Sequence, residues 1–133
     1  MSPTHEPRAR RSVTTRTARV WIGDDGILYV EPLPGCTQAR ADAIENIAVI
    51  GEVAAGRRPP ALADMRGVRG IDRGARAYYA EAPPVVSAMA LQVGSPLSRA
   101  VGTFFVGFNK PPTPTRLFTS ADEARAWLRG FIA

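Results

Sequence analysis

Four arginines are spaced through residues 66–76 in a pattern that could bind an anion. Arg66, Arg69, Arg73 and Arg76 surround Asp72, where we expect a helix to begin. Unpaired N–H groups and the helix dipole attract anions to the start of a helix, so the pattern favours a phosphate or a carboxylate. Asp72 weakens this interpretation, because a capping aspartate occupies some of the same N–H groups.

A second group of polar residues follows the apolar stretch that ends at Val93. Gly94-Ser95-Pro96 is typical of a helix start, with Ser95 as the cap. In an open parallel sheet, this loop and the loop after Met65 would meet at the carboxyl ends of the strands, the usual ligand crevice. The candidate anion or partner site comprises Arg66, Arg69, Asp72, Arg73, Arg76, Ser95, Ser98 and Arg99. The alternative is a solvated arginine surface.

Aromatic residues form a second candidate group. Its members are Trp21, Tyr78, Tyr79, Trp127, Phe104, Phe105 and Phe108. Part of this group could line a pocket for a lipid-like or small molecule, and the alternative is ordinary core at helical spacing. Because Tyr78 and Tyr79 are adjacent, only one can face the sheet fully, which leaves the other available to a protein partner.

The residues that most enzymes require do not form a recognisable set. His5 lies in an arginine-rich segment, and neither Ser95 nor Ser98 has an evident base. Cys36 is the only cysteine, so no intrachain disulfide can form, and we expect no metal site. Cys36 lies near an expected helix start, where a thiol pKa can fall, or it packs as a small residue. We therefore predict a non-enzymatic protein without a cofactor.

Apolar spacing and turn residues predict an α/β fold in the order β-β-α-β-α-β-α-β-α. Expected strands are 18–22, 27–31, 61–65, 85–93 and 115–119, and expected helices are 37–55, 72–82, 95–108 and 120–131. Thr37 is the expected cap of the first helix. After the opening hairpin every step between strands passes through a helix, which predicts a mixed, mostly parallel sheet. We expect one domain over residues 18–133 and a disordered tail over residues 1–17.

The net charge of +5 belongs mostly to the N-terminal segment, because residues 1–19 hold five arginines against Glu6. This segment could contact nucleic acid or an acidic partner, or could be a flexible, solubilising terminus. No aromatic residue interleaves the arginines, which makes nucleic acid the weaker interpretation. No export signal or membrane-length apolar stretch is evident, so we predict a cytoplasmic protein.

The segment around the first arginines resembles the STAS domains, the anti-sigma-factor antagonists of bacteria. In those regulators a strand is followed by Asp, an aliphatic residue, Ser-Gly and then Ile-Asp-Ser-Ser-Gly. The matching residues here are Asp64, Gly67, Val68, Ile71 and Asp72. The resemblance implies a STAS-like (SpoIIAA-like) fold and a regulatory role through protein contacts. Arg73 stands where the phosphorylated serine would be, so we expect the phosphorylation switch to be missing.

The C-terminal half is also similar to an uncharacterised bacterial family of small STAS-like proteins. The similarity lies in Gly94-Ser95-Pro96, Asn109-Lys110-Pro111 and Thr115-Arg116-Leu117-Phe118. It implies a fold but no known reaction. We predict a regulatory domain that binds a protein partner or a second copy of itself. The alternatives are a carrier or sensor of an anionic or amphipathic small molecule and, less favoured, a nucleic-acid adaptor.

Overall fold

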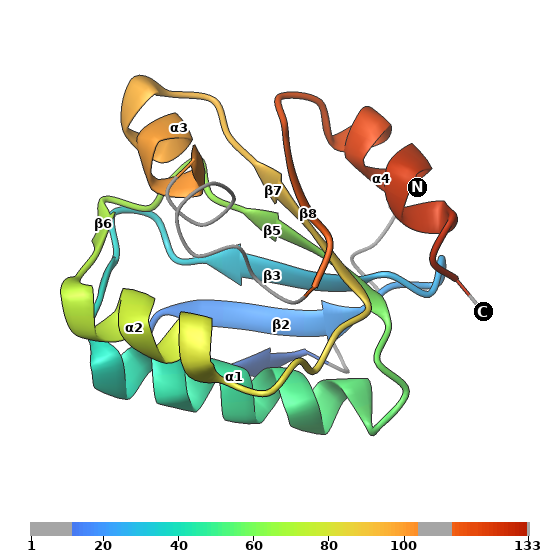
Figure 1. The fold of residues 1–133 in the computed structure, drawn as a ribbon, viewed down its shortest axis with the longest axis horizontal. Coiled ribbons are helices and arrows are strands. Elements are labelled where there is room, and N and C mark those ends of the chain that lie inside the picture. Colours follow the sequence, from blue (N-terminus) through green and yellow to red (C-terminus); the bar gives the residue numbers. More distant parts are fainter. Residues whose placement is uncertain (1–11, 104–112, 133) are drawn as a thin grey trace.

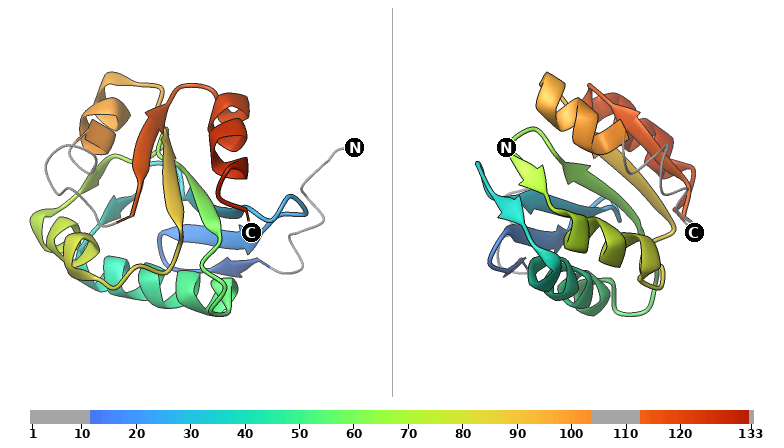
Figure 2. Two further views of the ribbon diagram at one scale, coloured as in Figure 1. Left: turned by 45° about the vertical axis from the view of Figure 1, so that its right-hand side comes forward. Right: turned by 60° about the vertical axis from the view of Figure 1, so that its left-hand side comes forward.

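The computed structural model describes residues 12–103 and 113–132, which form a sheet with helices on both faces (Figures 1 and 2). Six strands pair in the order β1-β2-β3-β5-β7-β8. They are β1 (Val13–Thr14), β2 (Ala18–Ile22), β3 (Leu28–Pro32), β5 (Pro60–Asp64), β7 (Ala88–Gln92) and β8 (Thr115–Phe118). Two short strands, β4 (Thr37–Gln38) and β6 (Gly70–Ile71), pair separately in parallel.

The predicted α/β architecture, mixed and mostly parallel, is confirmed. Strands β2 and β3 pair antiparallel around a turn in which Gly26 has a φ of +83°. From β3 onward the neighbouring strands of the sheet are parallel. The helices are α1 (Arg40–Ala54), α2 (Arg73–Glu81), α3 (Pro96–Thr103) and α4 (Ala121–Arg129). Parallel neighbours require such helical crossovers, because a tight turn can join only antiparallel strands.

Alternating side chains of the strands build a core on each face of the sheet. On β5, Ala61 and Ala63 belong to the clusters under α1 and α2, whereas Leu62 packs with Ala124 and Leu128 of α4. Figure 2 shows α1 and α2 together on one side and α4 on the other. Because successive side chains of a strand point to opposite faces, alternate residues of β5 contact the helices on opposite sides of the sheet.

The ends of several elements differ from the sequence-based prediction. Helix α1 begins at Arg40 rather than near Thr37, which lies in β4. The Asp42 carboxylate accepts a hydrogen bond from the Ala39 amide at 2.9 Å and so satisfies a backbone donor at the start of the helix. Strand β7 ends before Val93 and begins after Val85. The expected continuation of α3, with Phe104, Phe105 and Phe108, lies outside the described residues.

The structure also includes residues before the predicted start of the domain at residue 18. Strand β1 pairs with β2, and Thr15 and Thr17 are buried. The Arg16 guanidinium binds both carboxylate oxygens of Asp42 at 2.6 Å. Polar side chains, rather than an apolar pattern, anchor this segment. Residues 1–11 of the expected tail lie outside the described residues.

Within the described ranges, no helix is long and apolar enough to cross a membrane. In the same ranges, no three His, Cys, Asp or Glu side chains are grouped as metal ligands would be.

Candidate functional site

The loops after β5 and β7 lie side by side at the carboxyl ends of the strands, as the sequence predicted. Asp64 pairs in register with Gln92, and the Met65 amide donates to the Gln92 carbonyl at 2.8 Å. A Cβ added to Gly94 would lie 3.2 Å from Cγ of Arg66, so the second loop lies in close contact with the Arg66 side chain. We call this region, with the starts of α2 and α3, the carboxyl edge.

Arg66 is held within the carboxyl edge by Asp64. Its Nε and Nη2 atoms each donate to the Asp64 carboxylate at 2.8 Å. Burial raises the pKa of Asp64, but the hydrogen bonds and positive charge of Arg66 outweigh that effect and bring the pKa below its ordinary value. The charge of Arg66 is therefore already partnered within the chain.

The start of α2 is also satisfied internally. Asp72 caps the helix, because its Oδ1 atom accepts a hydrogen bond from the Ala75 amide at 2.9 Å. Arg76 turns back and donates from Nη1 to the Ile71 carbonyl at 2.8 Å. The Ala75 amide is thus unavailable to an anion, as the sequence suggested it would be.

Residues at the start of α3 also form hydrogen bonds with one another. The buried Ser98 hydroxyl accepts hydrogen bonds from the Gly94 and Ser95 amides, both at 3.0 Å. The Ser95 hydroxyl caps the helix by accepting from the Ser98 amide at 3.0 Å. Ser98 therefore occupies the two amides that an anion would need at this turn.

Four arginines of the candidate site are exposed, and Arg66 is the one that has an ion-pair partner among the described residues. Arg69, Arg73 and Arg99 have exposed side chains, and none of them forms a side-chain hydrogen bond or ion pair with another described residue. The predicted site thus contains residues that are bonded within the chain, Arg66, Arg76 and Ser98 among them, and three exposed arginines without a bonded partner in the described chain.

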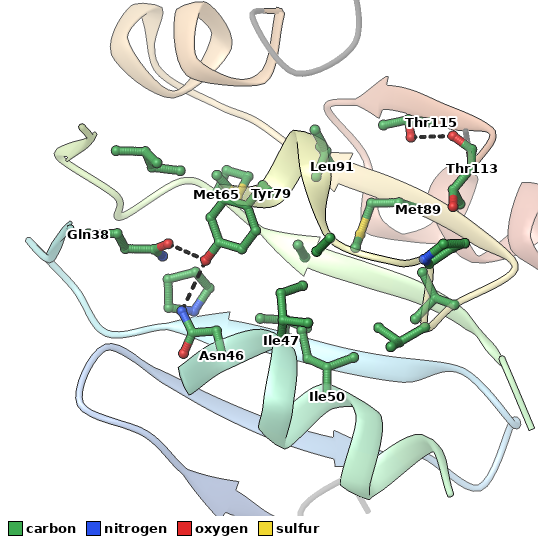
Figure 3. Close-up of a pocket in the computed structure, with 18 of the residues that line it drawn as sticks. Gln38, Asn46, Ile47, Ile50, Met65, Tyr79, Met89, Leu91, Thr113 and Thr115 are labelled. Carbon is green, nitrogen blue, oxygen red and sulfur yellow. Dashed lines mark hydrogen bonds between the residues drawn. The ribbon is translucent and has the colours of Figure 1, made fainter. Parts of the chain in front are cut away.

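The two adjacent tyrosines differ in their surroundings. Tyr79 points inward, where its hydroxyl donates to Gln38 at 2.5 Å and accepts from Asn46 at 3.1 Å (Figure 3). Burial raises the pKa of Tyr79 to about 12, so the hydroxyl stays protonated at neutral pH. Tyr78 is half-buried, with the Arg40 guanidinium 5.3 Å from its ring centre.

The two tryptophans of the candidate aromatic group do not form one pocket with the tyrosines. Trp21 stacks on Tyr29 with ring centres 5.4 Å apart. Trp127 packs against Phe118 and Phe131, on the face of the sheet that α4 covers. For the described members of this group, Tyr79 alone reaches the cavity described next.

A cavity of about 180 Å³ lies between the sheet and the helices α1 and α2 (Figure 3). Side chains from β3, β5 and β7 meet Ile47 and Ile50 of α1 and Tyr79 of α2 around it. No site was predicted from the sequence at Gln38, Asn46 or Met89. The one available signal was Asn46, an amide among the apolar positions of α1.

Cys36 does not have the activated thiol that a helix start could have produced. It is partly buried, and burial raises the pKa of its thiol. It packs beside the core cluster that includes Val68 and Ile71. The interpretation of Cys36 as a small packing residue therefore fits the structure.

Comparisons with solved structures define the class of this fold. The chain is similar to an uncharacterised protein with a SpoIIAA-like fold from Shewanella loihica PV-4, with 17% identity and a TM-score of 0.56 over 87% of this chain and 98% of the other. It is also similar to an anti-sigma factor antagonist from Mycobacterium paratuberculosis, with 20% identity and a TM-score of 0.57 over 88% of this chain and 99% of the other. The chain thus has the STAS-like fold.

The chain belongs to the family described as a domain of unknown function (DUF7793), which it matches over residues 20–132. A protein of unknown function from Arthrobacter sp. FB24 is 36% identical over 82% of this chain and 96% of its own, with a TM-score of 0.34. None of the curated proteins matches this chain.

Proposed function

We propose that this protein is a non-enzymatic regulatory domain whose carboxyl edge binds an acidic surface of a protein partner. The observation that carries the proposal is Arg73, an exposed cation at the start of α2 with no bonded partner in the described chain. It stands where the regulators that this sequence resembles carry a phosphorylatable serine. The structurally similar anti-sigma factor antagonist supports a regulatory role.

The exposed arginines suit a carboxylate-bearing surface. A guanidinium presents donors in a planar fork that matches a carboxylate, and Arg69, Arg73 and Arg99 are free to do so. The amides deeper in the edge are bonded to Asp72 and Ser98, which disfavours a small anion held by the backbone. An arginine cannot lose its charge as a phosphoserine does, so the contact would be constitutive.

The hydroxyls of the edge give no support to an enzymatic function. Ser95 and Ser98 bond to each other and to the backbone, and no histidine occurs in the described residues. A serine nucleophile needs a base within hydrogen-bonding reach. The exposed arginines of the carboxyl edge suit the binding of an acidic partner instead.

A photo-reactive amino acid placed at position 73 tests this function in cells of the native host. We expect it to crosslink to one acidic protein, and we expect the Arg69→Glu substitution to abolish the crosslink by repulsion. Position 58 provides the control, because Arg58 is equally exposed but lies in the loop before β5, at the opposite end of the strands. Equal crosslinking from both positions would refute the proposal, and a product of twice the mass of the chain would identify a second copy as the partner.

A second candidate function is the sensing or carrying of a small molecule. The cavity between the sheet and α1 and α2 favours it, because apolar pockets with a few polar groups are the usual form of ligand sites.

A further inference from the structure

We infer that the cavity between the sheet and helices α1 and α2 binds an uncharged, mainly apolar small molecule about the size of one substituted aromatic ring. The inference does not depend on the proposed protein partner. The volume of the cavity is about 180 Å³. An apolar cavity of about 150 Å³ in another protein accepts benzene, so the space here is sufficient for a ring with a small substituent.

The residues around the cavity argue against a charged ligand. No described residue that lines it is Asp, Glu, Lys, Arg or His. Tyr79 is the one ionisable group among them, and it remains neutral at pH 7. A carboxylate or an ammonium group would therefore lose its water without gaining a charged partner, which is strongly unfavourable. The arginines of the carboxyl edge are not part of this lining.

The apolar part of the lining is adaptable. Met65 and Met89 contribute flexible side chains from the sheet, opposite Ile47 and Ile50 of α1. Methionine fills irregular space and makes favourable contacts with aromatic rings. An unfilled apolar cavity destabilises a protein, so a ligand that fits this lining should stabilise the fold.

Polar groups lie at two places on the cavity wall, and both are bonded within the protein (Figure 3). Tyr79 is bonded to Gln38 and Asn46, and the Thr115 hydroxyl donates to the Thr113 carbonyl at 2.8 Å. The Thr115 oxygen can still accept a hydrogen bond. A ligand with one hydroxyl group would therefore be tolerated, whereas a ligand with several polar groups would not be satisfied.

Two probes that share a methyl-substituted ring test the inference on the full chain. p-Cresol is neutral at pH 7, whereas p-toluate has the same ring and methyl group but carries a negative charge. We expect p-cresol to shift the methyl NMR signals of Met65, Met89 and Ile50 with saturation and to raise the thermal midpoint. Binding of p-toluate should be at least about tenfold weaker. Absence of saturable shifts with p-cresol, or equal binding of the two probes, would overturn the inference.

Cavity-filling substitutions locate the binding. Ala63 lies on the sheet and Ala82 at the end of α2, and both line the cavity. We expect Ala63→Leu and Ala82→Leu to weaken p-cresol binding at least about tenfold, because each larger side chain occupies ligand volume. Ala80→Leu is the matched control, since Ala80 is exposed on the same helix and outside the cavity. Unchanged binding in a folded Ala63→Leu or Ala82→Leu variant would place the ligand elsewhere and contradict the inference.

Discussion

Tyr78 and Tyr79 have the same chemistry but make different contacts. The Tyr79 hydroxyl takes part in a buried group of hydrogen bonds with Gln38 and Asn46. Tyr78 contributes mainly its ring, which packs against the core and beneath Arg40. From the sequence, helical spacing shows that the two side chains diverge, but it does not show which one turns inward. Which tyrosine turns inward depends on the positions of the Gln38 side chain on β4 and the Asn46 side chain on α1.

We predict that Tyr79→Phe lowers the free energy of unfolding by about 1–3 kcal/mol, because it removes the hydrogen bonds that Gln38 and Asn46 make to the Tyr79 hydroxyl in a buried place. Urea denaturation measures the effect. Tyr78→Phe is the matched control, and we expect it to be nearly neutral. Equal losses in both variants would show that ring packing, rather than the Tyr79 hydrogen bonds, stabilises α2.

The pair formed by Arg16 and Asp42 joins the segment before residue 18 to helix α1. Asp42 is buried on the first turn of α1, and the Arg16 side chain reaches it across the surface. The hydrogen bonds and charge of Arg16 lower the pKa of Asp42. An arginine in a polar, threonine-rich segment carries no apolar signal, so this anchor cannot be recognised before its partner is placed.

We predict that Asp42→Ala destabilises the protein at neutral pH, on the order of 1 kcal/mol for the lost hydrogen bond at the helix start. Because the folded-state pKa is lowered, the contribution of Asp42 is present above the ordinary aspartate value of 3.8 and is lost as the pH falls through the folded-state value. Thermal midpoints of the two proteins should therefore converge in acid. Glu52→Ala, at an exposed site on the same helix, should show no such convergence.

At the scale of elements, turns and helix starts determine which backbone amides of the carboxyl edge are hydrogen-bonded within the chain. The strand and helix order followed from apolar periodicity and from residues such as Pro96 and Ser120, which mark helix starts. Strands β4 and β6 were not predicted, because two residues are too few to show a period. Their pairing places Gln38 beside Ile71 and so helps to form one end of the cavity.

We predict that Ser98→Ala destabilises the start of α3 by about 1–3 kcal/mol, since it leaves the Gly94 and Ser95 amides without their buried acceptor. Hydrogen exchange at these two amides should become faster. Ser87→Ala serves as the contrast, because the buried Ser87 hydroxyl has no hydrogen-bond partner among the described residues, and its loss should be neutral or slightly stabilising. Unaltered exchange at both amides in Ser98→Ala would disprove this account of the turn.

At the scale of the whole molecule, helix α2 connects the two proposed sites. Its first residue is Arg73 of the carboxyl edge, and Tyr79 lies at the cavity. The edge was predictable because its charged residues follow strands directly in the sequence. The cavity was not predictable, because it lies between side chains of β3, β5, β7, α1 and α2. These elements are far apart in the sequence, so no local sequence pattern indicates the space between them.

We predict that a chain beginning at residue 12 retains the thermal midpoint of the full chain, whereas a chain beginning at residue 18 has a clearly lower midpoint. The second truncation removes β1 and the bonds of Thr15, Arg16 and Thr17 to α1. Both truncations should reduce non-specific DNA retention, because both remove Arg8, Arg10 and Arg11. Equal midpoints for the two truncated chains would show that residues 12–17 contribute little to folding.

Asn46 joins three side chains from other parts of the chain through hydrogen bonds. Its Oδ1 atom accepts from Thr15, and its Nδ2 atom donates to Thr17 and Tyr79. No other residue type offers both an acceptor and two donors at this length of side chain, since aspartate lacks the donors and leucine lacks all three. Positions 15, 17, 46 and 79 should therefore change together among members of the DUF7793 family, so that divergence at one of them is accompanied by replacement at the others.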